Sequence, residues 1–143
     1  MDISPLFVKP EDIHEYHSEQ IALYGGLHGV GNPGLLDSAL ACPINLYSYD
    51  PEADLFDIAT AYAFHISQNQ AFNDGNKRTG LQAAIAFLKL NGYAVETSEE
   101  NLFKLMIRLA EGDMSRDEFS RSLCACSVRE RGLTTWLRRT LFP

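Results

Sequence analysis

The chain has 143 residues, enough for one domain with a hydrophobic core. Hydrophobic residues make up 45% of it and charged residues 22%, as in ordinary globular proteins, and no long apolar run predicts a membrane span. The net charge of −7 disfavours a general nucleic-acid binder, which needs basic surface to displace counterions from phosphates. The three cysteines show no second metal-ligand cluster, so we expect reduced thiols in a cytoplasmic protein. From the net charge and the lack of a long apolar run, we expect no direct binding to nucleic acid or membrane.

Capping signals and apolar periodicity predict about six helices and little sheet. In chain order, helices are expected from Pro10 to Gly25, from Asn32 to Leu40, from Asp54 to Ile66, from Lys77 to Asn91, and after capping-box patterns at Thr97–Glu100 and Ser115–Glu118. The helix that begins at Lys77 carries apolar residues on several faces, which indicates a central, buried position. Short strands are expected at residues 3–8 and 93–95. The sequence therefore predicts a compact all-α single domain over residues 1–123.

The remaining residues, 124–143, form a tail that mixes arginines with large apolar side chains. This basic amphipathic pattern is compatible with a membrane surface, a partner protein or the domain itself. Undocked, Trp136 and the neighbouring leucines would form an exposed apolar patch. We therefore expect the tail to dock onto the domain or onto a partner.

The most informative segment is 69–79, which places polar residues and two cations directly before a predicted helix. A turn at a helix start presents unpaired backbone N–H groups at the positive end of the helix dipole, where anions bind. Lys77 and Arg78 add positive charge, and Asp74 could hold a Mg²⁺ ion that bridges phosphates. A plain polar turn is the alternative, but the two adjacent cations favour a nucleotide-phosphate site.

This segment resembles the signature of the Fic/Doc (Fido) family, His-x-Phe-x-Asp/Glu-Gly/Ala-Asn-Gly/Lys-Arg. The matching residues are Phe72, Asp74, Gly75, Asn76, Lys77 and Arg78, and the motif histidine falls on Gln70. Lys77 stands where the AMP-transferring members usually have glycine, so the segment looks like the Doc branch, the death-on-curing toxins of bacterial toxin–antitoxin modules. The resemblance implies the Fido fold, with ATP and Mg²⁺ as cofactors. It also implies that Asp74 holds the metal and that Gly75, Asn76, Lys77 and Arg78 bind phosphates.

The same resemblance implies a function and its partners. A Doc-like toxin would act as a kinase that transfers a phosphoryl group from ATP to a hydroxyl of a translation elongation factor, and an antitoxin would hold it silent. Transfer of AMP is an alternative. A second alternative is a catalytically inactive Fido domain that only binds nucleotide or a partner, and Gln70 favours this one.

Gln70 occupies the position where a general base would be useful, and an amide cannot accept a proton at neutral pH. Three interpretations stay open: a natural loss, an inactivating substitution introduced so that a toxic protein could be produced, or a base supplied from elsewhere. His65 precedes Gln70 by five residues on the preceding helix. At about 100° per residue it should point about 140° away, so we do not expect it to replace the missing histidine.

A flap is also expected between the second and third helices. The segment Leu46, Tyr47, Ser48 and Tyr49 lies between Pro43 and Pro51. On sequence alone it is equally compatible with a plain connecting loop. In Fido proteins the equivalent region aligns the target beside itself, in effect adding a strand, so the resemblance favours a target-binding flap.

Overall fold

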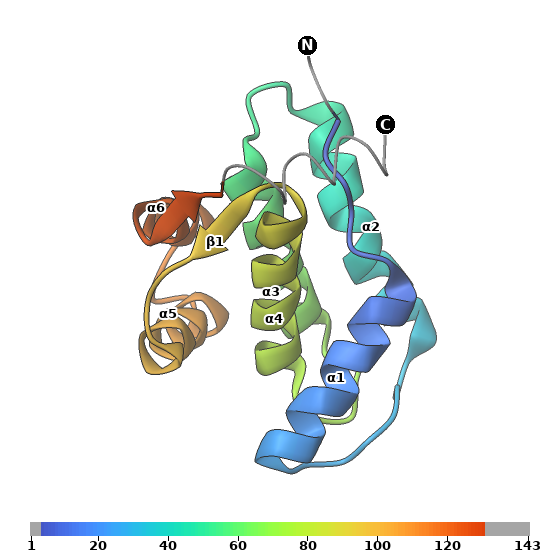
Figure 1. Cartoon of the computed structure of the whole chain (residues 1–143). Helices are drawn as coiled ribbons and strands as arrows, with labels where there is room; N and C mark the ends of the chain where they lie inside the picture. The colour runs from blue at the N-terminus through green and yellow to red at the C-terminus, as the bar shows by residue number, and fades with distance from the viewer. Residues whose placement is uncertain (1–3, 131–143) are drawn as a thin grey trace.

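A computed structural model of the chain describes residues 4–130, which form six helices and one two-stranded sheet (Figure 1). The elements are, in order, α1 (Pro10–Tyr24), α2 (Pro33–Tyr49), α3 (Leu55–Asn69), α4 (Asn76–Leu90), β1 (Tyr93–Val95), α5 (Glu99–Glu111), α6 (Arg116–Ala125) and β2 (Ser127–Arg129). The predicted all-α fold is therefore confirmed. Within the described part of the chain, every helix is too short or too polar to cross a membrane.

Helices α3 and α4 form a hairpin at the centre of the fold (Figure 1). Helices α1 and α2 cover one side of this hairpin, and α5 and α6 cover the other. Gly80 lets the two central backbones approach closely, because a Cβ atom there would lie 2.8 Å from the carbonyl oxygen of Ala63. The loop that joins α3 to α4, residues 70–75, is thus held between two well-packed helices.

Most helices begin where the sequence predicted. The expected N-caps are confirmed at Asn32, Asp54 and Ser115, each of which accepts a hydrogen bond from a backbone N–H of the first turn. The predicted start of α5 is wrong by one residue, because Ser98 and not Thr97 is the N-cap. At Glu96 the chain is still paired with the residue that follows α6, because the Glu96 N–H donates to the Cys126 carbonyl oxygen. The helix therefore begins one residue later.

Helix α2 is longer than predicted, so the segment that was expected to form a flap is helical. It continues through Pro43 to Tyr49, so the proposed flap residues Leu46, Tyr47, Ser48 and Tyr49 form its last turn. Asp50 N–H still donates to the Leu46 carbonyl oxygen at 2.9 Å. Proline normally breaks a helix, but Pro43 lies on the buried face of α2, and packing against α3 outweighs the local penalty. The backbone N–H groups of these residues donate within the helix, so they are not free to pair with an added strand.

The small sheet joins β1 to β2 in antiparallel register, with Ala94 opposite Val128. The predicted strand at 93–95 is confirmed, and β2 consists of residues that the sequence had assigned to the tail. The rest of that tail, residues 131–143, lies outside the described residues. Residues 4–8 form no strand, contrary to expectation, because the backbone of Leu6 instead forms two hydrogen bonds of 2.9 Å with the side chain of Asn91.

Candidate functional site

The loop between α3 and α4 reverses the chain with two left-handed residues. Gln70 follows the last turn of α3 with φ 50° and ψ 44°, and it is the single non-glycine residue with positive φ in the described part of the chain. Gly75, with φ 76°, precedes α4. Left-handed conformations suit glycine and are strained for most other residues. We call residues 70–78 the cradle.

Side chains behind the cradle fix its shape. The Asn76 amide forms two hydrogen bonds to the backbone of Phe72, accepting from its N–H at 3.1 Å and donating to its carbonyl oxygen at 3.0 Å. The buried ring of His17 stacks on Phe72 with 4.0 Å between ring centroids, and His17 Nε2 lies 2.7 Å from the Asp74 carbonyl oxygen. Asn76, predicted to bind phosphate, therefore uses its side chain to hold the loop, which leaves its main-chain N–H for an anion.

The first residues of α4 line the hollow of the cradle, and no side chain in the described part of the chain caps their backbone N–H groups. Gly75 supplies no side-chain cap, and the first intrahelical bond runs from Thr79 N–H to the Gly75 carbonyl oxygen at 3.0 Å. In a helix the N–H groups of the three residues before that bond, here 76–78, have no intrahelical partner. Together with the helix dipole they form a positive end that favours an anion.

A hollow of about 540 Å³ lies in front of this helix end. Its volume is within the range usual for small-molecule sites. It brings together Gln70, Asp74 and the predicted phosphate-binding residues 75–78, and residues of α1 and α5 complete the wall. The lining residues are Gln20, Tyr24, Gly25, Gly26, Ser67, Gln70, Asn73, Asp74, Gly75, Asn76, Lys77, Arg78 and Phe103.

Two cations face this hollow. Lys77 is exposed, and the Arg78 guanidinium carbon lies 3.7 Å from the ring centroid of Tyr24 and 3.9 Å from that of Phe103. The described residues contain two ion pairs, Glu100–Lys104 and Asp117–Arg121, and neither involves a cradle cation. Lys77 and Arg78 are therefore both available to neutralise a bound anion.

Among the described residues that line the hollow, Asp74 is the single acidic one. Its Oδ2 accepts a hydrogen bond of 2.7 Å from the Leu27 N–H. No group of three or more metal-ligating side chains occurs in residues 4–130. A Mg²⁺ ion shared with substrate phosphates needs only one or two carboxylates, so the cradle fits a metal that arrives with a nucleotide.

The comparisons with known proteins agree with this geometry. A sequence model of the Fic/DOC family matches residues 7–88, more than half of the chain and all of the cradle. The chain belongs to the Fic/DOC family. It is similar to "Protein kinase doc" of Escherichia phage P1, at 34% identity over 108 residues that cover 76% of this chain and 85% of that protein. It is also similar to "Toxin Doc" of Mycolicibacterium smegmatis, at 36% identity over 103 residues that cover 70% and 79%.

Gln70, where the family resemblance places the motif histidine, lines the hollow. His65 instead lines a separate hollow with Cys42 and Arg116, in agreement with the predicted orientation. Burial, with a smaller contribution from Arg116, lowers the pKa of His65. His65 is therefore poorly placed to serve the cradle.

Two other histidines, His14 and His17, contact the ring of Phe72 in the cradle. His14 meets the Phe72 ring edge-on at 6.0 Å, and burial lowers the pKa of His17 below its usual 6.5. A neutral His17 ring can donate its Nε2–H to the Asp74 carbonyl oxygen. These contacts give His14 and His17 a structural role behind the cradle.

One element beside the cradle was missed by the sequence analysis. Residues 25–32 run antiparallel to the loop, with Val30 bridged to Phe72. The Gly31 and Asn32 N–H groups both donate to the Ala71 carbonyl oxygen, at 2.8 and 3.0 Å. The glycine-rich composition of this segment was the available signal, because glycine permits close backbone approach. This extended segment, and not residues 46–49, lies next to the site.

Proposed function

We propose that this chain is a Doc-like toxin of a toxin–antitoxin module. It would transfer a phosphoryl group from ATP to a hydroxyl of a target protein. The observation that carries this proposal is the open N-terminus of α4, flanked by Lys77, Arg78 and Asp74 in one hollow. The names of the two relatives, a protein kinase and a toxin, support the same class of activity.

The cradle supplies what phosphoryl transfer needs. Such reactions depend mainly on positioning and on neutralising charge at the transferred group. The N–H groups of residues 76–78 and the two cations would bind the phosphates. Asp74 would hold Mg²⁺, which supplies further neutralisation when bound. Lys77, in place of the usual glycine, favours phosphoryl over AMP transfer.

Gln70 limits the rate of this reaction. Its amide cannot remove the proton of the attacking hydroxyl. General acid–base catalysis typically contributes about 10²–10⁴-fold, so turnover should be slow while nucleotide binding is kept. The second candidate function, a domain that binds nucleotide or partner without catalysis, rests on this same residue.

The target and the inhibitor are proteins in this proposal. A translation elongation factor is the target that the family resemblance implies, and the cytoplasm is the compartment where it would be met. Leu23, near the end of α1, and Leu27, whose N–H is bonded to Asp74, are 71% and 67% exposed and would offer apolar surface to a target. An antitoxin would bind and silence the toxin.

Incubation with labelled ATP and cell extract tests the proposal. The Gln70→His variant should label a target strongly, and the unaltered chain about 10²–10⁴-fold more slowly. Gln68→His is the matched control, because this exposed glutamine lies outside the cradle hollow. Its labelling should equal that of the unaltered chain.

A growth assay provides the second readout. At equal protein levels, Gln70→His should be more toxic than the unaltered chain, and His65→Ala should change nothing. If neither chain labels a target although both bind ATP, the binding-module function is correct. Label that retains the adenine ring but not the γ-phosphate would instead indicate AMP transfer.

A further inference from the structure

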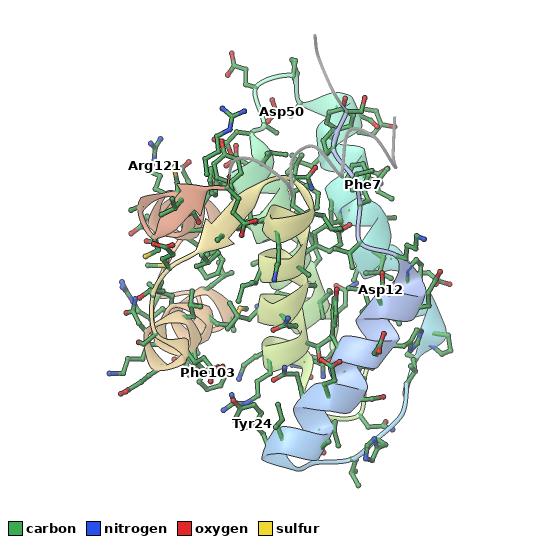
Figure 2. The ribbon with its side chains drawn as sticks, in the orientation of Figure 1. Phe7, Asp12, Tyr24, Asp50, Phe103 and Arg121 are labelled. Carbon is green, nitrogen blue, oxygen red and sulfur yellow. The ribbon has the colours of Figure 1, made fainter. Side chains whose placement is uncertain are left out.

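The Arg78 side chain lies between two aromatic rings that come from different helices. Tyr24 is the last residue of α1, and Phe103 lies in the second turn of α5. These helices pack on opposite sides of α4, and Figure 2 shows both residues at the same end of the molecule. The guanidinium carbon is 3.7 Å from one ring centroid and 3.9 Å from the other. Each distance is well inside the range of a cation–π contact.

This arrangement restricts what the guanidinium can do. Its N–H donors lie in the plane of the group, so rings that cover its faces leave the donors free at the edges. A long side chain otherwise samples many rotamers, and the two rings remove much of that freedom before any ligand binds. Lys77 is exposed and, among residues 4–130, makes no such contact with an aromatic ring, so it is the comparison within the same helix turn.

We propose that Tyr24 and Phe103 are positioning residues that orient Arg78 toward the bound phosphate. This rests on the proposed function of the cradle. Both rings line the cradle hollow together with Arg78. The same three residues also line a second hollow of about 260 Å³ between α1, α4 and α5. The stack is therefore a thin wall with open space on both sides.

Because the two rings lie at the surface, their effect on Arg78 can be distinguished from an effect on packing of the core. Tyr24 is 51% exposed, and neither ring is among the buried core residues. Removing one ring should thus change the stability of the fold little. The effect should fall on the orientation of Arg78, and through it on phosphate affinity.

Calorimetric titration with ATP·Mg²⁺ tests this inference. Tyr24→Leu and Phe103→Leu should each weaken binding about three- to tenfold, whereas Tyr24→Phe and Phe103→Tyr should retain most of the affinity. In an Arg78→Ala background the leucine variants should cause no further loss, because the residue they orient is gone. Phe64→Leu is the matched control, since it also removes a ring that contacts an arginine. The Arg116 guanidinium carbon lies 4.4 Å from the Phe64 ring centroid, and both residues lie outside the cradle.

A nucleotide-free measurement distinguishes the two proposals. In the unaltered chain, ring currents should shift the Arg78 Nε–H resonance, and each leucine variant should remove part of that shift. If Arg78→Ala weakens ATP binding but the ring variants do not, the positioning role is refuted and the phosphate site stands. If ATP·Mg²⁺ does not bind the unaltered chain at all, the proposed function fails and the positioning role fails with it. Equal losses from the leucine variants with and without Arg78 would also refute positioning, because the rings would then act independently of the arginine.

Discussion

Two substitutions of Asp74 should separate its structural contact from its proposed metal role. Its Oδ2 accepts the Leu27 N–H at 2.7 Å, which ties residues 25–32 to the cradle. Asp74→Asn keeps an oxygen that can accept this bond but removes the charge that a divalent cation needs. Asp74→Ala removes both. Comparing the two variants therefore assigns each effect to one function.

The expected magnitudes differ between the two readouts. A hydrogen bond to a charged acceptor contributes about 1.5–3 kcal/mol, and the lower end applies here because Asp74 and Leu27 are both exposed. Asp74→Ala should thus lower the free energy of unfolding by roughly 1.5 kcal/mol, and Asp74→Asn by less than half of that. Both variants should lose the Mg²⁺-dependent part of ATP affinity, by at least about tenfold, since even residues behind metal ligands commonly contribute that much.

Urea denaturation measures the first quantity, and calorimetric ATP titration with Mg²⁺ or with EDTA measures the second. Asp117→Asn is a suitable control, because it removes one carboxylate charge far from the cradle, in an exposed pair with Arg121. An Asp74→Asn variant whose ATP affinity responds to Mg²⁺ as strongly as that of the unaltered chain would refute the metal role. An Asp74→Ala variant of unchanged stability would refute the structural one.

Three further predictions concern the scaffold. Gly80→Ala should destabilise the fold by up to about 2 kcal/mol in urea denaturation, because overpacking against the Ala63 carbonyl, at 2.8 Å, costs about 1–3 kcal/mol and helix propensity returns about 1; a more stable variant would mean that α3 and α4 can separate freely. Gln70→Gly should not lower stability and should raise it by up to about 1 kcal/mol, since it relieves a left-handed conformation at φ 50°; a clear loss would show that the Gln70 side chain stabilises the loop. The free energy of unfolding should fall as the pH is lowered from about 7.5 to about 5.5. Burial lowers the pKa values of His17 and His65 below 6.5, so the unfolded chain binds protons at a higher pH than the folded one. A urea midpoint that rises as the pH is lowered would contradict the burial of these two histidines.

The sequence predicted those features that depend on nearby residues. Helix starts at Asn32, Asp54 and Ser115 were correct because a cap and the N–H group it accepts are three residues apart. The cradle was located for the same reason, since its turn, its cations and its helix start are contiguous. The extension of α2 through Pro43 was not predictable in this way, because the helix is maintained by packing on α3.

Strand β2 shows the same dependence on distant partners. It is only three residues long and pairs with β1, more than thirty residues earlier in the chain. Nothing in its local composition distinguishes it from a tail. The contact between residues 25–32 and the cradle is another pairing of this kind, joining residues about forty positions apart.

The side chains that hold the cradle predict that its shape does not depend on the residue at position 70. The loop is fixed by the Asn76 amide on Phe72, by His17 on the Asp74 carbonyl and by the Asp74 carboxylate on Leu27. Within residues 4–130, none of the hydrogen bonds that hold the cradle involves the Gln70 side chain. Histidine is also one of the side chains that tolerate positive φ better than most. A change at position 70 should therefore alter the group that lines the hollow while the rest of the cradle keeps its shape.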